Sequence, residues 1–366
     1  MRSSLAWMTL LITVFAGVAQ ARAADDAVAL ARAGTAALEA RRFGDALAAF
    51  TKAAEMQPSD ASLCFGAGVA AFMLGKNELA QARFECALAR DPAFLPAAMW
   101  LADLHYRAGR LTDAISIYET AQKHSLKPHD LQPQLDLWRK ELALQNQFHD
   151  ARSEHFVVLF EAADDEPLAA DVIWRLETAY RRIVSTMGVS PSQPITVVIY
   201  TRDQFNDITR LADWSAAAYD GRIRVPADGA SREAGELDRI LSHEFVHALV
   251  SQVGGRTVPA WINEGLATVL EPAGAGDVEA TLARPGERRA LSQLPYSFVG
   301  LSRHDAELAY ASSARAVRQL IERRGIGALV ALLEDLGQGA PFTRAFQQRL
   351  AMRYEDFSAS VARDSF

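Results

Sequence analysis

Two short strings, HEFVH at residues 243–247 and WINEGLA at residues 261–267, decide how the second half of this chain folds. A helix brings residues four apart onto one face, so His243 and His247 present their imidazoles side by side. The second string adds the carboxylate of Glu264. Two His and one Glu leave one coordination position open, which is typical of a catalytic zinc site.

Chance explains the first string poorly, because random placement at this composition gives HExxH only about 0.01 times per chain. The alternative is a helix with two surface histidines. Its neighbours Leu241, Phe245 and Leu249 are apolar, and buried imidazoles need partners. One metal ion satisfies both. Glu244 lies beside them and is placed to act on a metal-bound water as general base.

The N-terminal region, residues 27–128, repeats with a period of 34 residues. Its recurring positions resemble the tetratricopeptide repeat (TPR), a helix–turn–helix unit, and predict three repeats in an all-α solenoid. Such an array either binds a peptide or protein partner in its groove or only stabilises the chain, and the sequence leaves both open. The recurring positions are Gly34 and Gly68; Ala46, Ala80 and Ala114; Phe50, Phe84 and Tyr118; and Ala53, Ala87 and Ala121.

Residues 129–150 form the next segment, with an apolar face that includes Leu131, Leu135, Trp138 and Leu142. This periodicity predicts a helix. Terminal repeats need a covering element, so we expect this helix to cap the array and link it to the second half.

Residues 152–272 alternate strand and helix patterns, which predicts an α+β domain. We expect the last of its strands to be an edge strand, because it ends at Pro226. The expected elements are strands at 155–160, 195–200 and 221–225 and helices at 171–187 and 231–252.

Residues 273–366 form the C-terminal part. It begins in a Gly-rich charged stretch, 272–289, which predicts an exposed loop. From residue 306 the pattern is helical. We expect segments ending near 322 and 336 and one last helix after Pro341.

The second half resembles the peptidase MA-like group of the gluzincin zinc metallopeptidases. The resemblance rests on HEFVH, on VPAWINEGLA at residues 258–267 and, more weakly, on AYASS at residues 309–313. It implies that His243, His247 and Glu264 bind Zn²⁺ and that Glu244 is the catalytic base.

Other zinc peptidase classes match less well. A metzincin needs Gly at position 250 and His at position 253, where this chain has Val250 and Val253. An ExxxD pattern after Glu264 would require Asp at position 268, where Thr268 stands. The gluzincin pattern is therefore the one that the residues support.

The resemblance also implies an oxyanion donor, and Tyr310 is the candidate, since related enzymes place a tyrosine hydroxyl there. The alternative role for Tyr310 is a packed helical aromatic. His304 is a lesser candidate for the same role. Asn263 is a candidate to position the ligands, and we expect Trp261 to belong to the core or the pocket wall.

The strand at 221–225 is a candidate to pair with an extended substrate. Related aminopeptidases carry a glutamate there for the substrate's free amine. This chain has Arg222 and Arg224 and no Glu, which favours an endopeptidase over an aminopeptidase.

The chain starts with a pattern typical of a secretory signal at residues 1–23. Arg2 precedes an apolar stretch at 5–18, and small residues follow up to Ala23. We therefore expect an exported protein, periplasmic or extracellular, with no stable membrane span after cleavage. The formal net charge of −7 gives no support for nucleic-acid binding.

Cys64 and Cys86 are the two cysteines of the chain. Export makes a disulfide chemically possible. TPR repeats fold without such bridges, so we expect both to be small buried apolar residues, and a disulfide is the alternative.

Together these patterns predict an exported zinc metallopeptidase whose TPR array recruits a peptide or protein substrate or a partner. Two alternatives share the same residues. One is a TPR scaffold with a catalytically degenerate zinc domain, and the other is hydrolysis of a non-peptide amide such as a cell-wall bond.

Overall fold

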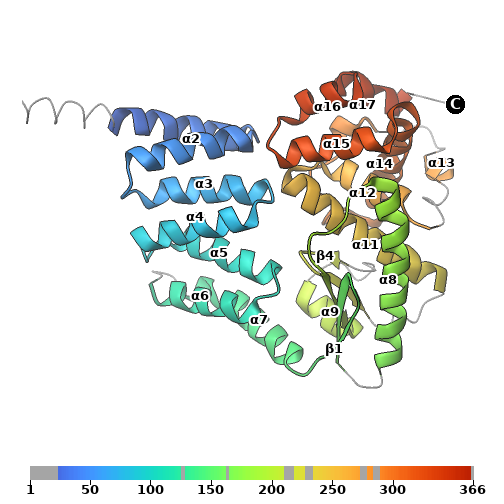
Figure 1. The fold of residues 1–366 in the computed structure, drawn as a ribbon, viewed down its shortest axis with the longest axis horizontal. Coiled ribbons are helices and arrows are strands. Elements are labelled where there is room, and N and C mark those ends of the chain that lie inside the picture. Colours follow the sequence, from blue (N-terminus) through green and yellow to red (C-terminus); the bar gives the residue numbers. More distant parts are fainter. Residues whose placement is uncertain are drawn as a thin grey trace, which may run out of the picture.

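Helix pairs with small residues at their crossings build the N-terminal part of the computed structural model (Figure 1). A Cβ on Gly34 would lie 2.8 Å from the Phe50 ring, and one on Gly68 would lie 2.6 Å from the Phe84 ring. The predicted repeat thus has a steric reason, because a recurring glycine admits a recurring aromatic ring. The structure describes residues 24–124, 128–161, 165–209, 218–226, 234–272, 278–282 and 289–363.

The array stacks these helices in chain order, and the predicted capping helix completes it. The predicted signal at residues 1–23 lies outside the described residues. No described helix is both long and apolar enough to cross a membrane. The elements are a first helix at 24–39, α2 (Phe43–Met56), α3 (Ala61–Met73), α4 (Asn77–Arg90), α5 (Leu95–Arg107), α6 (Leu111–His124), the 3₁₀ turn η1 (Pro128–Asp130) and α7 (Gln132–Gln145).

A disulfide joins Cys64 on α3 to Cys86 on α4, so the expectation that both cysteines are unpaired was wrong. The two helices are antiparallel neighbours of one repeat, and this pairing brings together residues 22 positions apart. The Arg90 guanidinium also donates to the Cys64 sulfur at 2.6 Å.

A five-stranded sheet follows the array, in the order β1-β2-β3-β5-β4. The three inner strands are parallel, and the two outer strands pair antiparallel with their neighbours. The sheet elements are β1 (His149–Arg152), β2 (Phe156–Phe160), β3 (Ile195–Tyr200), β4 (Ala218–Tyr219) and β5 (Ile223–Pro226), with α8 (Glu166–Met187) between β2 and β3 and α9 (Arg202–Thr209) after β3.

Two features of the sheet differ from the sequence-based expectations. The strand expected at the edge, β5, pairs with β3 on one side and with β4 on the other, where Ala218 lies opposite Arg224 and Tyr219 opposite Ile223. The polar strand β1 was not predicted, because its residues HDAR carry no apolar alternation and it is held by its backbone pairing to β2.

Among the remaining helices, α11 packs on the sheet, and α12, α14 and α15 pack around α11 and one another to complete the largest apolar core. The expected loop at 272–289 contains a short helix, and the expected last helix is two helices. The elements are α11 (Ala234–Gly254), η3 (Gly255–Thr257), α12 (Ala260–Val269), α13 (Val278–Thr281), η4 (Leu291–Gln293), α14 (Arg303–Arg324), α15 (Ile326–Gly337), α16 (Phe342–Leu350) and α17 (Tyr354–Arg363).

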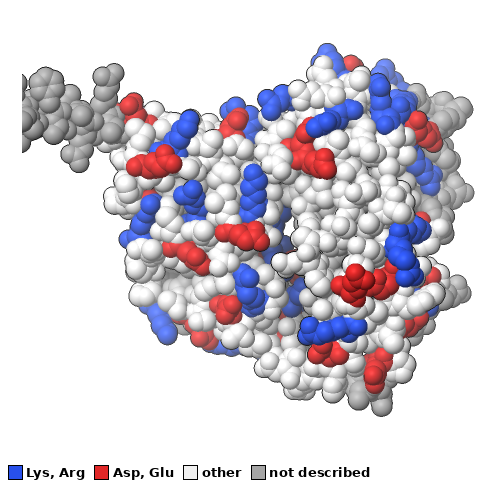
Figure 2. All heavy atoms as spheres, viewed as in Figure 1, with Lys and Arg blue, Asp and Glu red and all other residues white. Residues whose placement is uncertain are grey.

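The observed architecture confirms the predicted fold class, an all-α TPR solenoid followed by an α+β domain with a helical C-terminal part. The domain limits proposed above stay predictions. The array and the second half lie side by side in Figure 1. Figure 2 shows Lys and Arg interspersed with Asp and Glu over both parts of the same face, so opposite surface charges do not distinguish the two parts there.

Buried polar contacts join the array to the sheet. Glu141 on α7 is fully buried, and its Oε1 accepts from Arg222 at 3.1 Å and from Arg224 at 2.8 Å. Tyr106 on α5 donates to its Oε2 at 2.8 Å, and Tyr200 on β3 donates to its Oε1 at 3.1 Å. One buried carboxylate therefore fixes α7 against the β3–β5 side of the sheet.

We expect Glu141→Gln to lower the free energy of unfolding by about 3–5 kcal/mol, because it leaves two buried guanidinium groups short of their shared counter-charge. Denaturant unfolding measures this loss. The control is Glu119→Gln, which removes a half-exposed carboxylate that pairs with Arg139 at 2.6 Å. It should cost at most about 1 kcal/mol. Equal losses in the two variants would contradict the assigned role of Glu141.

Candidate metal centre

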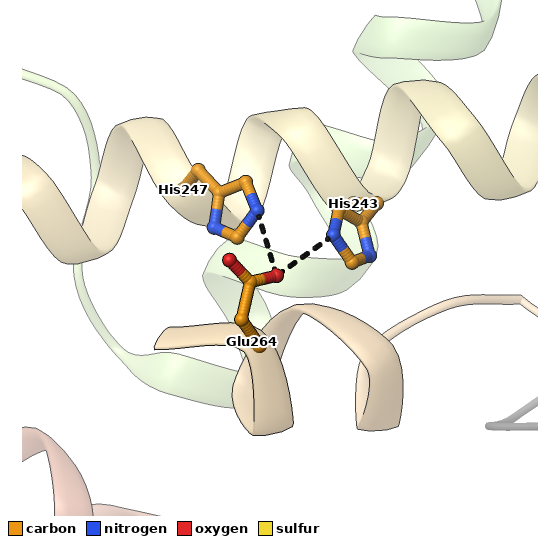
Figure 3. A group of neighbouring side chains, drawn as sticks. All are labelled: His243, His247 and Glu264. Atoms are coloured by element: carbon orange, nitrogen blue, oxygen red, sulfur yellow. Dashed lines mark ion pairs between the residues drawn. The ribbon is translucent and has the colours of Figure 1, made fainter. Parts of the chain in front are cut away.

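Helices α11 and α12 bring three side chains together, as Figure 3 shows. His243 and His247 lie one turn apart on α11, with ring centroids 4.6 Å apart. Glu264 on α12 approaches from the other side, and its Oε2 lies 3.4 Å from His243 Nε2 and 3.3 Å from His247 Nε2. One ligand atom from each residue falls within 4.8 Å of the others. The geometry thus groups the three residues that the sequence predicts as ligands.

Two residues of the local sequence position helix α12, which carries Glu264. Pro259 precedes the helix and sets its start. Gly265, next to Glu264, permits the packing of α12 on α14, since a Cβ there would lie 2.5 Å from the Ser313 carbonyl oxygen and 2.6 Å from Val317. Trp261 packs between α12 and the last helices, with its ring centroid 6.5 Å from that of Phe346, so it belongs to the core, as expected.

The residues present fit a divalent metal ion. The donor set is two imidazole nitrogens and one carboxylate, which suits zinc and related transition metals. Glu244 Oε2 is buried without a hydrogen-bond partner among the described residues, while Glu264 Oε2 is buried and forms ion pairs with both imidazoles. A buried unpaired carboxylate oxygen is costly, and a cation among these groups would remove that cost.

The charges of the site shift the pKa values of its groups. Burial by itself would lower the pKa of His243, but Glu264 and Glu271 outweigh it and raise this pKa to about 10. Burial would also lower the pKa of His247, but Glu264 outweighs it and raises this pKa. Burial would raise the pKa of Glu264, yet the two histidines hold it well below its usual range. Without a metal, the site therefore retains protons that a metal must displace.

Glu271 is a residue of the site that the sequence reasoning missed. The His243 ring donates from Nδ1 to Glu271 Oε1 at 2.9 Å, and this carboxylate is buried. Such a contact fixes which ring nitrogen faces the metal position. An ExxxD pattern would require Asp at position 268. Thr268 stands there, and its hydroxyl donates to the Glu264 carbonyl. Helical spacing gave no signal for it, because Glu271 lies just beyond α12, which ends at Val269.

Glu244 lies beside the candidate ligands and is buried, with 7% of the residue exposed. Burial raises its pKa, while His247 and His243 oppose the shift. A carboxyl group with a raised pKa can accept and return a proton near neutral pH, which is what a general base needs.

Tyr310 on α14 reaches the same site, with its ring centroid 6.3 Å from that of His243. Burial raises its pKa, and the charges of Glu264 and Glu244 add to the shift. Its hydroxyl therefore stays protonated and can donate a hydrogen bond. His304, the other candidate, is exposed in the first turn of α14 and is not part of the His/His/Glu group.

Two further candidates have other surroundings than expected. Asn263 Oδ1 is buried with no hydrogen-bond partner among the described residues, so no hydrogen bond supports a positioning role for it. Arg222 and Arg224 are buried at the array interface around Glu141. The hypothesis that residues 221–225 offer a free edge to a substrate was wrong, because β4 covers β5 at Ile223 and Arg224.

Comparison with protein families agrees with this architecture. Residues 176–356 match the model of the Peptidase MA superfamily, and residues 31–82 and 65–130 match the tetratricopeptide repeat model. These matches confirm the resemblance that the motifs indicated. A search of curated proteins found no significant match.

Metal binding should weaken as the pH falls. A pKa of about 10 for His243 means that this ring carries a proton at neutral pH in the metal-free site. Each proton displaced lowers the apparent affinity about tenfold per pH unit. We expect the apparent Zn²⁺ affinity to fall at least about tenfold from pH 8 to pH 7, measured by competition with a chromophoric chelator. A pH-independent affinity would contradict the assigned protonation.

Glu271→Gln should lower the apparent Zn²⁺ affinity about 10–100-fold, because an amide orients and polarises the His243 ring less well than a carboxylate. The same chelator competition at a fixed pH measures the change. Glu322→Gln, at an exposed position near the end of α14, is the matched control and should bind Zn²⁺ as the wild type does. Equal Zn²⁺ affinities for all three proteins would contradict the assigned contribution of Glu271 to metal binding.

Proposed function

We propose that this chain is an exported, zinc-dependent endopeptidase whose TPR array recruits a substrate or partner. The observation that carries the proposal is the convergence of His243, His247 and Glu264, with the buried carboxylate of Glu244 beside them. The matches to the Peptidase MA superfamily and to the tetratricopeptide repeat indicate a peptidase-like protein with TPR repeats. The metal, the mechanism and the location are the parts that we infer.

Zinc is the metal that this donor set supports best, because two neutral imidazoles and one carboxylate leave a position open for substrate and solvent. When bound, zinc supplies a Lewis acid that polarises the scissile carbonyl and lowers the pKa of water. The side chains that would hold it are His243, His247 and Glu264. The contact from Glu271 would keep the His243 ring in the tautomer that binds through Nε2.

Glu244 would move the proton during hydrolysis. Its carboxylate takes a proton from the attacking water and then passes it to the leaving amine. The raised pKa of this carboxyl group suits both transfers. Tyr310 would donate its hydroxyl hydrogen to the developing oxyanion, since burial keeps that hydroxyl protonated.

The choice of endopeptidase rests on the acidic groups near the sheet edge. Within residues 218–226 the one acidic side chain is Asp220, and its carboxylate accepts from Arg224 at 3.0 Å. A carboxylate paired in this way is poorly suited to hold a substrate's free amine. Arg222 and Arg224, which stand in the same stretch, are buried at the array interface.

Export is supported by two independent features. Residues 1–23 carry the pattern of a secretory signal. The disulfide between Cys64 and Cys86 fits an oxidising compartment, since such bonds persist outside the reducing cytosol.

We infer that a peptide binds the array near its first helix. A hollow of about 370 Å³ lies between the first helix and α3. It combines apolar side chains with charges of both signs, which suits an extended peptide segment. Its lining includes Val28, Arg32, Thr35, Glu39, Asp60 and Leu63.

A scaffold with a degenerate zinc domain is the rival function. The burial of Glu244 disfavours it, because a scaffold gains nothing from a buried carboxylate oxygen without a hydrogen-bond partner. Hydrolysis of a non-peptide amide would use the same residues, and a substrate assay separates it.

The test is cleavage of a mixture of unfolded proteins by the mature, zinc-loaded protein, with new termini mapped by mass spectrometry. We expect internal cleavage by the wild type and a rate at least about 100-fold lower for Glu244→Gln. Both proteins should hold about one zinc per chain, since Glu244 is not a ligand.

Each other outcome has a definite meaning. Equal cleavage by the two proteins, or no cleavage by either when zinc is bound, would contradict a peptidase. Stepwise removal of N-terminal residues would contradict the endopeptidase assignment. Cleavage of a cell-wall amide but of no protein would favour the non-peptide alternative.

A further inference from the structure

Three turns of the array share one backbone geometry but not one residue type. Arg41, Gly75 and Gly109 lie 34 residues apart and have φ values of 55°, 74° and 76°. In each turn, the amide of the next residue bonds to the carbonyl five residues before it, at 2.8, 3.0 and 2.9 Å. This is the left-handed end of a helix, where glycine is normally found. The first repeat therefore places an arginine where the other repeats have glycine.

A left-handed backbone is unfavourable for arginine, and a glycine would serve the turn without that cost. What an arginine adds to this turn over a glycine is its side chain, and that side chain makes a contact outside the turn. Its guanidinium lies 4.7 Å from the ring centroid of Tyr296, which belongs to the second half of the chain. A cation over an aromatic face is attractive, and the guanidinium also lies 5.9 Å from the ring of Phe43.

Tyr296 lies on the segment between η4 and α14, which we call the 294–301 loop. Its side chain is 79% exposed, so burial in the core does not hold it in place. Phe298, two residues later, is buried, and its ring meets Tyr310 edge to face with centroids 5.7 Å apart. Tyr310 in turn lies beside His243. The first repeat is thus linked to the candidate metal centre through the Arg41–Tyr296 contact, the loop backbone between Tyr296 and Phe298, and the ring contacts of Phe298 and His243 with Tyr310.

We propose that Arg41 is a positioning residue for Tyr310: it holds Tyr296, and with it the 294–301 loop that packs Phe298 on Tyr310. This inference rests on the proposed function, because it assigns Tyr310 the role of oxyanion donor. The array then does more than recruit a substrate, since its first repeat keeps the donor in place. A small displacement of such a group lowers the rate strongly.

The first experiment measures the kinetics of zinc-loaded Arg41→Gly on a quenched fluorescent peptide that the wild type cleaves. We expect kcat to fall about tenfold and KM to change less than about twofold, because Tyr310 acts in the transition state. The glycine suits the turn, so the thermal midpoint should stay within about 3 °C of the wild type. An unchanged kcat would overturn the proposal, and a fall in kcat that follows a fall in the thermal midpoint would also do so.

Conservative variants test the contact itself. Arg41→Lys keeps a cation and Tyr296→Phe keeps the aromatic face, so both should retain most of kcat, whereas Tyr296→Leu should lower it as Arg41→Gly does. The double variant of Arg41→Gly with Tyr296→Leu should be no slower than either single variant. Additive losses would mean that the two residues act separately and would contradict the proposal. Arg42→Ala is the matched control, because Arg42 pairs with Asp45 and should leave kcat unchanged.

Hydrogen exchange does not depend on peptidase activity, so it tests this inference separately from the proposed function. Arg41→Gly should speed amide hydrogen exchange in the 294–301 loop, measured by mass spectrometry, and Arg42→Ala should not. Unchanged exchange in Arg41→Gly would overturn the tether even in an active enzyme. Full cleavage by Glu244→Gln would instead contradict the proposed function, and the exchange result would still decide whether the tether exists.

Discussion

Burial of the Glu141 carboxylate between the array and the sheet is the constraint on which the arrangement of the two parts depends. Its oxygens accept from Arg222 and Arg224 on one side and from Tyr106 on the array side. Separating the parts would leave these charges without their partners, which costs far more than loss of an exposed ion pair. The β4–β5 hairpin is therefore held by the array, and the array is an integral part of the fold.

Close packing of α12 on α14 positions the residues of the candidate metal centre, as the contacts of Glu141 fix the array against the sheet. Gly265 lets α12 approach α14 so closely that any larger residue would meet the Ser313 carbonyl oxygen. That approach brings Glu264 opposite His243 and His247 and brings Tyr310 to the same side. The site therefore combines three helices, and its buried carboxylates suit a cation because solvent is largely excluded.

Most elements and most candidate residues could be predicted because their signals are local. The repeat, the helix that carries His243 and the candidate ligand Glu264 follow from periodicity and spacing in the sequence. The strand β1 escaped prediction because its four residues have no apolar alternation and depend on β2 for pairing. Glu271 escaped because its role is visible only when α12 lies against α11. The disulfide escaped because it depends on how α3 packs on α4.

Periodicity and motif spacing were enough to predict the TPR solenoid, the α+β class and the grouping of two His and one Glu, because helical and strand periods are properties of the chain. Three features follow instead from long-range packing: β5 lies inside the sheet, Arg222 and Arg224 pair with Glu141 at the interface, and Arg41 contacts Tyr296. These contacts join residues that are from tens to hundreds of positions apart. Such partners are chosen by the packing of whole elements, which local patterns do not encode.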